Sequence, residues 1–110
     1  MGRRSEDTRA AFERAVAERA RQRYVLRLYV SGASPKSTQA IGNLKKVCEE
    51  RLAGRYELEV VDVYQQPDRA GADHVVATPT LVRRSPLPLR RLIGDLSNTA
   101  LLLQRLELAI

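Results

Sequence analysis

The fold of this chain is decided by the stretch Ala77-Thr78-Pro79-Thr80-Leu81, together with Arg90-Arg91-Leu92-Ile93-Gly94-Asp95-Leu96-Ser97 a short distance downstream. A Thr-Pro step that enters one strand, followed by a second strand, a glycine and a helix cap, predicts a β-β-α unit. The two strands, over residues 80–84 and 87–93, are expected to form a hairpin around Ser85-Pro86-Leu87-Pro88. The prolines of this turn indicate a sheet edge or a wide connection.

The upstream sequence predicts a strand, a helix and a second strand. Tyr24–Val30 alternates as a strand does, and Ser34 then supplies a helix N-cap with Pro35 at the first helical position. Gly54 is the expected C-cap, and residues 56–63 form a second strand whose apolar end is typical of a strand covered on both faces. Strand, helix and strand predict a parallel pair. The apolar positions along the helix are Ala40, Ile41, Leu44, Val47, Cys48 and Leu52.

Two further segments complete the predicted order of elements. Residues 65–73 are polar and contain Pro67 and Gly71, so they form either a loop or a short helix. Ser97 or Asn98 is expected to cap a last helix. The buried side of that helix is predicted to carry Leu101, Leu102, Leu106 and Ala109.

Residues 1–23 differ from the rest of the chain because arginines alternate with carboxylates there. Phe12, Val16 and Ala20 recur at helical spacing, which predicts a charged helix with a thin apolar stripe, capped by Asp7 or Thr8. Such a helix can bury little apolar surface. We therefore expect an arginine-rich helical extension over residues 1–23 and one domain over 24–110.

Composition restricts the class of protein. A chain of 110 residues with 44% hydrophobic and 29% charged residues is expected to fold as one domain in the cytoplasm, because it shows no export signal and no apolar run of membrane-spanning length. One cysteine fits a reducing compartment. The net charge of +6 either serves solubility or attracts an acidic partner. Aromatic residues are not interleaved with the arginines, so neither nucleic acid nor membrane is an expected partner.

The element order β-α-β-(α)-β-β-α is similar to that of thioredoxin-like domains, an α/β class. A redox member would carry Cys-x-x-Cys after the first strand, where this chain reads Ser31-Gly32-Ala33-Ser34-Pro35-Lys36-Ser37. Cys48 lies on the apolar helix face and is expected to be buried. His74 cannot build a metal cluster alone, and is either a solvated loop residue, a partner of Asp73 or a contact residue. We therefore expect no enzyme activity, no metal and no cofactor.

A more specific resemblance emerges when these segments are combined. The strand from Tyr24, the loop at 32–37, Val61-Asp62-Val63, Ala77 to Leu81, and Pro86 through Ser97 together resemble the KaiB family of circadian-clock proteins. The resemblance runs from Tyr24 to the C-terminus. It implies a non-enzymatic regulator that binds the N-terminal ATPase ring of a KaiC-type hexamer and modulates its phosphorylation cycle.

The resemblance also implies alternatives of function and of fold. A thioredoxin-like adaptor or sensor module, similar to the domain at the front of SasA histidine kinases, is the second functional hypothesis, with a histidine kinase as partner. A degenerate redox enzyme is the third. Family members form either a thioredoxin-like monomer that binds KaiC or a ground-state fold with a rearranged C-terminal half that assembles into dimers or tetramers. Two such packings need differ by only a few kcal/mol.

Candidate site residues follow from the hairpin and from the resemblance. Arg83, Arg84, Arg90 and Arg91 are expected to converge into a basic, partner-binding patch. Family positions implicated in the KaiC contact correspond to Gln39, Glu59, His74 and Arg91. The residues expected to matter for the rearrangement are Thr78, Pro79, Pro86, Pro88, Gly94, Asp95 and Arg105. Arg105 stands where clock members often have glycine, a change that favours helix by roughly 0.5–1 kcal/mol and hence the thioredoxin-like state.

Overall fold

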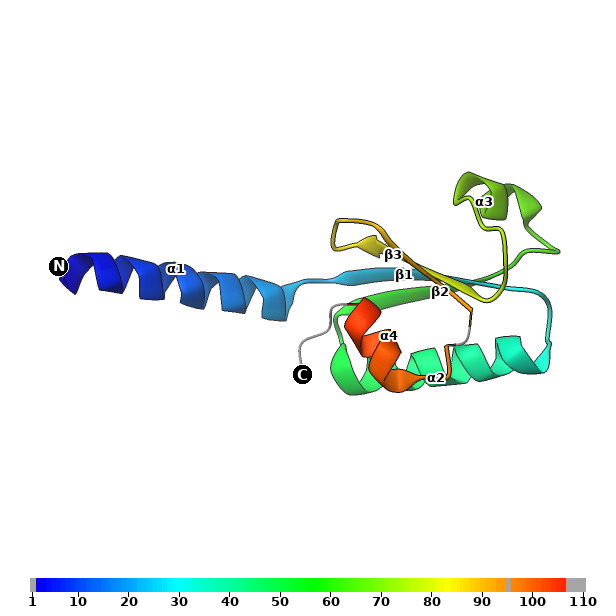
Figure 1. The fold of residues 1–110 in the computed structure, drawn as a ribbon, viewed down its shortest axis with the longest axis horizontal. Helices are drawn as coiled ribbons and strands as arrows, with labels where there is room; N and C mark the ends of the chain where they lie inside the picture. The colour runs from blue at the N-terminus through cyan, green and yellow to red at the C-terminus, as the bar shows by residue number, and fades with distance from the viewer. Residues whose placement is uncertain (1, 95, 107–110) are drawn as a thin grey trace.

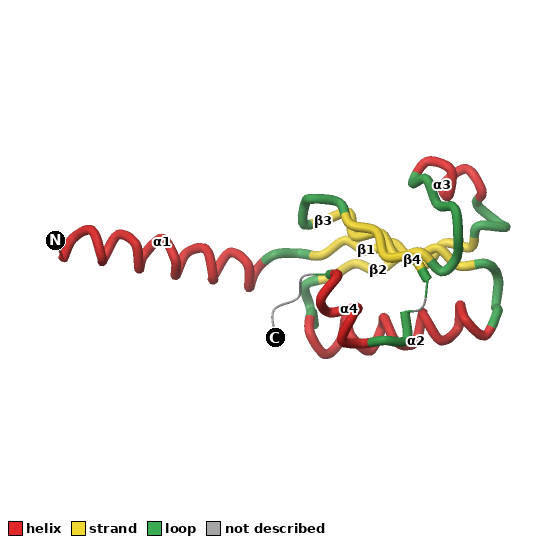
Figure 2. Tube along the Cα trace, in the orientation of Figure 1, coloured by secondary structure: helices red, strands yellow, loops and turns green. Residues whose placement is uncertain are grey.

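The computed structural model describes residues 2–94 and 96–106. Its centre is a four-stranded sheet in the order β2-β1-β3-β4. Helices α2 and α4 cover one face of this sheet, and the short helix α3 lies over the other (Figure 1). The coloured trace in Figure 2 shows the same three layers, with the N-terminal helix α1 standing away from them. The predicted β-α-β-α-β-β-α order is therefore present, preceded by one helix.

The first half of the domain matches the predicted strand, helix and strand. These elements are β1 (Tyr24–Val30), α2 (Pro35–Arg51) and β2 (Tyr56–Asp62), and β1 and β2 pair in parallel. The Ser34 hydroxyl caps α2 by accepting a hydrogen bond of 3.2 Å from the Ser37 backbone N–H. The C-cap is Leu52 rather than Gly54. Gly54 instead takes φ +74° in a turn that the Arg55 N–H closes onto the Leu52 carbonyl at 2.7 Å.

Strand β2 corrects one expectation. It is an edge strand of the sheet, and its burial pattern shows that its apolar end is not covered on both faces. Val61 is fully buried, whereas Val60 is 38% exposed. The apolar end of the strand therefore reflects a half-buried edge, which a continuous run of hydrophobic residues cannot distinguish from a central strand.

The second half contains α3 (Pro67–Ala72), β3 (Thr80–Ser85), β4 (Arg90–Ile93) and α4 (Thr99–Arg105). The polar link thus forms a short helix. The hairpin is confirmed, with β3 and β4 antiparallel and β3 also antiparallel to β1. Strand β4 begins at Arg90 rather than Leu87, and Pro88, which has no N–H to donate to a ladder, lies in the connection. The bonds before Pro79, Pro86 and Pro88 are cis.

The last helix is capped as predicted. The Asn98 side chain accepts a hydrogen bond of 3.0 Å from the Leu101 N–H. Leu102, Leu103 and Leu106 are buried, whereas Leu101 is only partly buried. Asp95 and Ala109, which carried sequence expectations, lie outside the described residues.

Helix α1 spans Gly2–Arg21. It begins before Asp7 and Thr8, so neither residue caps its start. Phe12 and Val16 of the predicted stripe are 69% and 50% exposed. The helix projects along the long axis of a molecule that measures 61 × 26 × 21 Å (Figure 1).

Candidate functional site

The four arginines of the hairpin do not form one patch. Side chains alternate between the two faces of a strand, so adjacent arginines point to opposite sides of the sheet. Arg83 pairs across the hairpin with Arg90, and Val82 pairs with Arg91. Arg83 and Arg90 therefore belong to the face that α2 and α4 cover. Arg84 and Arg91 belong to the α3 face, and both contact Asp73 there.

Arg83 is part of the core rather than of the surface. It is 2% exposed, and its guanidinium donates to the Leu106 carbonyl at 2.7 Å and to the Pro88 carbonyl at 3.0 Å. Leu106 is the C-cap of α4, where the last carbonyls lack helical partners and a cation is favourable. In this arrangement Arg83 joins β3 to α4 and to the β3–β4 connection, and its side chain is buried rather than presented at the surface.

Arg90 and Arg91 lie at the outer edge of the sheet. Together with Leu89, Gln104 and Arg105 they line an open groove between β4 and α4. Arg105 is the last residue of α4 and is exposed. The described lining of this groove thus carries three arginines, of which Arg90 and Arg91 belong to the predicted patch.

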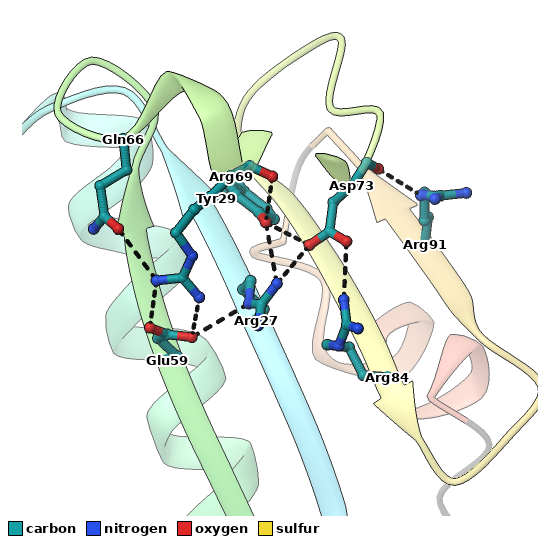
Figure 3. Close-up of polar contacts among 8 residues, drawn as sticks. All are labelled: Arg27, Tyr29, Glu59, Gln66, Arg69, Asp73, Arg84 and Arg91. Carbon is teal, nitrogen blue, oxygen red and sulfur yellow. Dashed lines mark hydrogen bonds and ion pairs between the residues drawn. The ribbon is translucent and has the colours of Figure 1, made fainter. Parts of the chain in front are cut away.

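The α3 face is organised around Asp73, which directly follows α3 and is 6% exposed (Figure 3). One carboxylate oxygen accepts hydrogen bonds from the Tyr29 hydroxyl and, at 3.0 Å, from Arg27 Nη1. The other oxygen accepts from Arg84 Nη1 at 2.9 Å. The backbone carbonyl of the same residue accepts from Arg91 Nε at 3.2 Å. Asp73 therefore joins α3 to β1, β3 and β4; we call this set of five residues the Asp73 cluster.

The electrostatics of the Asp73 cluster favour the ionised carboxylate. Burial alone would raise the pKa of Asp73, but the hydrogen bonds from Tyr29 and Arg27 and the nearby arginine charges outweigh it and lower the pKa below 3.8. Burial, reinforced by the hydrogen bond to Asp73, raises the pKa of the Tyr29 phenol above 10.0. The cluster therefore keeps its charges throughout the neutral range.

A second and more exposed group of hydrogen bonds connects α3 to β2. Arg69 Nη1 and Nη2 donate to the two carboxylate oxygens of Glu59 at 2.6 and 2.5 Å, and Arg27 Nε approaches Glu59 at 3.3 Å. Hydrogen bonding from Arg69 lowers the pKa of Glu59 below 4.5. The Glu59 side chain is 50% exposed, so this pair contributes less than its geometry suggests.

The remaining sequence-predicted contact residues are divided between the two layers. His74 is exposed next to Asp73, with φ +55° and its N–H donating to the Gly71 carbonyl at 3.1 Å. Gln39 is exposed on α2, across the sheet. The structure therefore brings His74, Arg84 and Arg91 together and separates Gln39 from them.

Of the residues expected to matter for a rearrangement, Thr78, Pro79 and Gly94 meet at the start of the hairpin. Pro86 and Pro88 lie in the β3–β4 connection, and Arg105 is the last residue of α4. The Thr78 hydroxyl hydrogen-bonds the Ser31 hydroxyl at 2.6 Å, which joins the hairpin to the loop after β1. The buried Pro79 accepts from the Gly94 N–H at 3.1 Å. Gly94 has φ +105°, a conformation that side chains rarely adopt, so a glycine is required there.

Sequence reasoning did not assign Asp73, Arg27 or Tyr29 to this site. A usable signal exists, because Arg27 sits in the middle of a strand that is otherwise apolar. A guanidinium in a central strand requires an acceptor on the same face of the sheet. The identity of that acceptor depends on a contact 46 residues away, which local patterns do not encode.

The structure places no thiol at the loop where a redox centre would lie. The Ser31 to Ser37 loop contains no cysteine, and Cys48 is fully buried in α2. Burial raises the pKa of the Cys48 thiol to about 11, so little thiolate forms at neutral pH. Among residues 2–94 and 96–106 no group of three metal-ligating side chains occurs. In the same part of the chain, none of the helices combines the length and the apolar character that a membrane span requires.

Fold and site together define the class as a thioredoxin-like domain without the redox cysteines. The solution structure of the N-terminal domain of SasA from Synechococcus elongatus matches with a TM-score of 0.64 at 28% identity, covering 78% of this chain and 85% of that one. Mitochondrial thioredoxin 3 from Saccharomyces cerevisiae also gives 0.64, at 22% identity over 81% and 83% of the two chains, which shows the shared fold. Of the two predicted arrangements, the chain has the thioredoxin-like one.

Sequence comparison narrows this class to one family. The KaiB domain family matches residues 27–108, and the chain therefore belongs to the KaiB family. Circadian clock protein KaiB3 of Synechocystis is 46% identical over 86 residues, covering 78% of this chain and 84% of that protein. The circadian clock oscillator protein KaiB of Synechococcus elongatus is 46% identical over 88 residues, covering 80% and 86%. The predicted resemblance is confirmed.

Proposed function

We propose that this protein is a non-enzymatic clock regulator that binds the N-terminal ATPase ring of a KaiC-type hexamer and modulates its phosphorylation cycle. The observation that carries the proposal is the combination of KaiB family membership with a thioredoxin-like second half. The resemblance to the KaiB family implies that the thioredoxin-like monomer is the form that binds the ring. The fold thus supplies a binding surface, and the empty redox loop leaves no thiol chemistry at the usual position.

The α3 face is the part of the surface that we assign to the ring. His74, Arg84 and Arg91 lie there together, and all three are exposed. Arg91 is a permanent cation held in place through its Nε, so its terminal nitrogens are directed by the backbone of Asp73. A fixed guanidinium loses little side-chain entropy when it meets a carboxylate, which favours an acidic partner surface.

Binding is tested with the cognate KaiC-type ATPase in the presence of ATP, using the wild-type ring and variants that mimic each phosphorylation state. Interferometry should show association with at least one ring form, and Arg91→Glu should weaken it at least about tenfold because like charges would then face each other. Lys46→Glu is the matched control, since Lys46 is an exposed cation on α2. Absence of association with every ring form overturns the proposal.

A second candidate function is an adaptor or sensor module for a histidine kinase. It is favoured by the likeness to the SasA domain, which covers 85% of that domain. In a competition experiment, the isolated SasA-type domain and this protein would displace each other if they share one ring site. Direct association with a kinase in the absence of the ring would instead favour the adaptor.

Absence of enzyme activity is tested at Cys48. A thiol–disulfide exchange assay should give no rate above that of free thiol, because the buried thiol has a raised pKa. Exchange that disappears in Cys48→Ser would show a redox function instead.

The division into an extension over residues 1–23 and a KaiB-like domain over 24–110 is also part of the proposal, as is assembly into dimers or tetramers. Deletion of residues 1–22 separates the two roles that the exposed Phe12 and Val16 stripe allows. Loss of ring binding would make helix α1 a partner-binding segment, whereas a changed mass in light scattering would make it an oligomerisation arm.

A further inference from the structure

Helix α3 has very little apolar contact with the sheet that it covers. It contains six residues, and Ala70 is the one described as buried. Ala70 packs with Tyr29, Val61 and Val82 in a cluster much smaller than the one on the opposite face. An alanine methyl buries too little surface to hold a helix against a sheet, since each buried CH₂ contributes only about 0.8 kcal/mol. Even with the partly buried Val63 and Val75 beside it, this small apolar cluster leaves much of the placement of α3 to polar contacts.

The Asp73 cluster supplies that attachment. Asp73 terminates α3, and its own N–H donates to the Arg69 carbonyl at 3.2 Å, so the carboxylate is rigidly joined to the helix. From this position the carboxylate binds β1 through Arg27 and Tyr29, and β3 through Arg84. The Tyr29 hydroxyl additionally reaches the Arg69 carbonyl at 3.0 Å. The bonds to the Asp73 carboxylate are charge-assisted and mostly buried, a setting in which they are stronger than neutral bonds on a surface.

We infer that Asp73 is the positioning residue of the α3 face: its carboxylate holds α3 on the sheet and binds Arg84, and its backbone fixes the places of His74 and Arg91. His74 follows Asp73 directly in the chain, Arg84 is bound by the carboxylate, and Arg91 is bound by the Asp73 carbonyl. One residue thus contacts exposed groups from β3, from β4 and from the turn after α3. Figure 3 shows the two arginines approaching Asp73 from neighbouring strands.

Glu59 provides an internal comparison for this inference. It also binds α3, through two hydrogen bonds from Arg69, but its side chain is 50% exposed whereas that of Asp73 is 8% exposed. Exposed pairs contribute little even with good geometry, whereas removing one member of a buried pair leaves charges without a partner. We therefore expect that replacing the carboxylate by an amide has a large effect on α3 at Asp73 and a small effect at Glu59.

The test is amide hydrogen exchange on the full chain, comparing Asp73→Asn with Glu59→Gln. An asparagine keeps the shape of the aspartate side chain but replaces one carboxylate oxygen by an NH₂ group. This NH₂ then faces one of the two guanidinium groups, and because both groups are donors only, no hydrogen bond forms between them. We expect exchange in residues 67–74 to accelerate at least about tenfold in Asp73→Asn, while residues 40–48 of α2 change little. Glu59→Gln should change the same segment less than about threefold.

Three results would overturn the inference. They are unchanged exchange in Asp73→Asn, equal acceleration in α3 and α2, or an equal effect of Glu59→Gln. If Asp73→Asn fails to fold, Tyr29→Phe removes a single hydroxyl from the cluster and should give the same local pattern with a smaller amplitude. The exchange readout does not depend on the proposed function. Ring binding by Asp73→Asn is a separate measurement, in which weakened binding is expected only if the α3 face also contacts the ring.

Discussion

On the α2 and α4 face of the sheet, leucines from both halves of the chain form one large apolar cluster, whereas the α3 face has a small apolar cluster and a charged network. Leu28 and Leu81 represent the first face, and Arg27 and Asp73 the second. Apolar burial is non-directional and tolerates small displacements, but a buried carboxylate needs each donor at a definite place. The α2 and α4 face therefore supplies most of the stability of the fold, and the α3 face fixes where α3 and the side chains around Asp73 lie.

The largest test of this comparison is truncation in the apolar cluster. Leu28 is 0% exposed, so we expect Leu28→Ala to reduce the free energy of unfolding by about 2–5 kcal/mol. Val82→Ala on the α3 face should cost less, because fewer carbon atoms are removed and the surrounding cluster is smaller. Urea denaturation followed by circular dichroism measures both. An equal loss in the two variants would contradict the division between the faces.

A smaller effect should separate the two adjacent arginines of β3. Arg83→Met removes the hydrogen bonds that join β3 to α4 and to the β3–β4 connection. It should lower the free energy of unfolding by about 1–3 kcal/mol, because two carbonyls lose their donors. Arg84→Met, at a side chain that is 42% exposed, should cost at most about 1 kcal/mol. The same urea experiment applies. A larger loss for Arg84 would show that the α3 face carries more stability than its apolar content suggests.

The pH dependence of stability tests the charged face alone. Because the pKa of Asp73 is lowered in the folded protein, its contribution is fully present above 3.8 and is lost as the pH falls below that value through the folded pKa. The difference in unfolding free energy between the wild type and Asp73→Asn should therefore be constant at neutral pH and narrow on acidification. Urea midpoints measured from about pH 7 down to about pH 3 provide the readout. A difference that grows on acidification would contradict the assigned sign.

The smallest effect is expected outside both faces. Phe12 is 69% exposed on α1, so Phe12→Ser should change the free energy of unfolding by less than about 0.5 kcal/mol. Thermal unfolding is sufficient to measure this. A loss of the size expected for a core residue would show that α1 packs against an apolar surface in solution.

Patterns within short stretches of sequence correctly predicted several helices and strands. Alternation marked β1, the Ser34-Pro35 pair marked the start of α2, and Asn98 was one of two candidate caps for α4. Each of these signals acts within one turn of helix or one strand, where backbone hydrogen bonding and side-chain periodicity are directly coupled.

Arrangement between elements was less predictable. Strand β2 is an edge strand because the hairpin pairs with β1 on the other side, and nothing within residues 56–62 specifies that order. The hairpin alone does not make Arg83 and Arg84 converge, since consecutive residues of a strand face opposite sides. Asp73 could be placed only once α3 was known to lie over β1. The site is therefore mostly a product of long-range contacts, and family resemblance identified its function class better than its geometry.

The projection of α1 has a hydrodynamic consequence. The radius of gyration is 17.0 Å, whereas a compact chain of 110 residues should have about 13 Å. An elongated monomer diffuses more slowly than a sphere of the same mass. This 12.4 kDa protein should therefore elute from a size-exclusion column earlier than a compact protein of equal mass, at a volume expected for a dimer. Oligomeric state is therefore better determined from scattered light or sedimentation, in which mass and shape are separable.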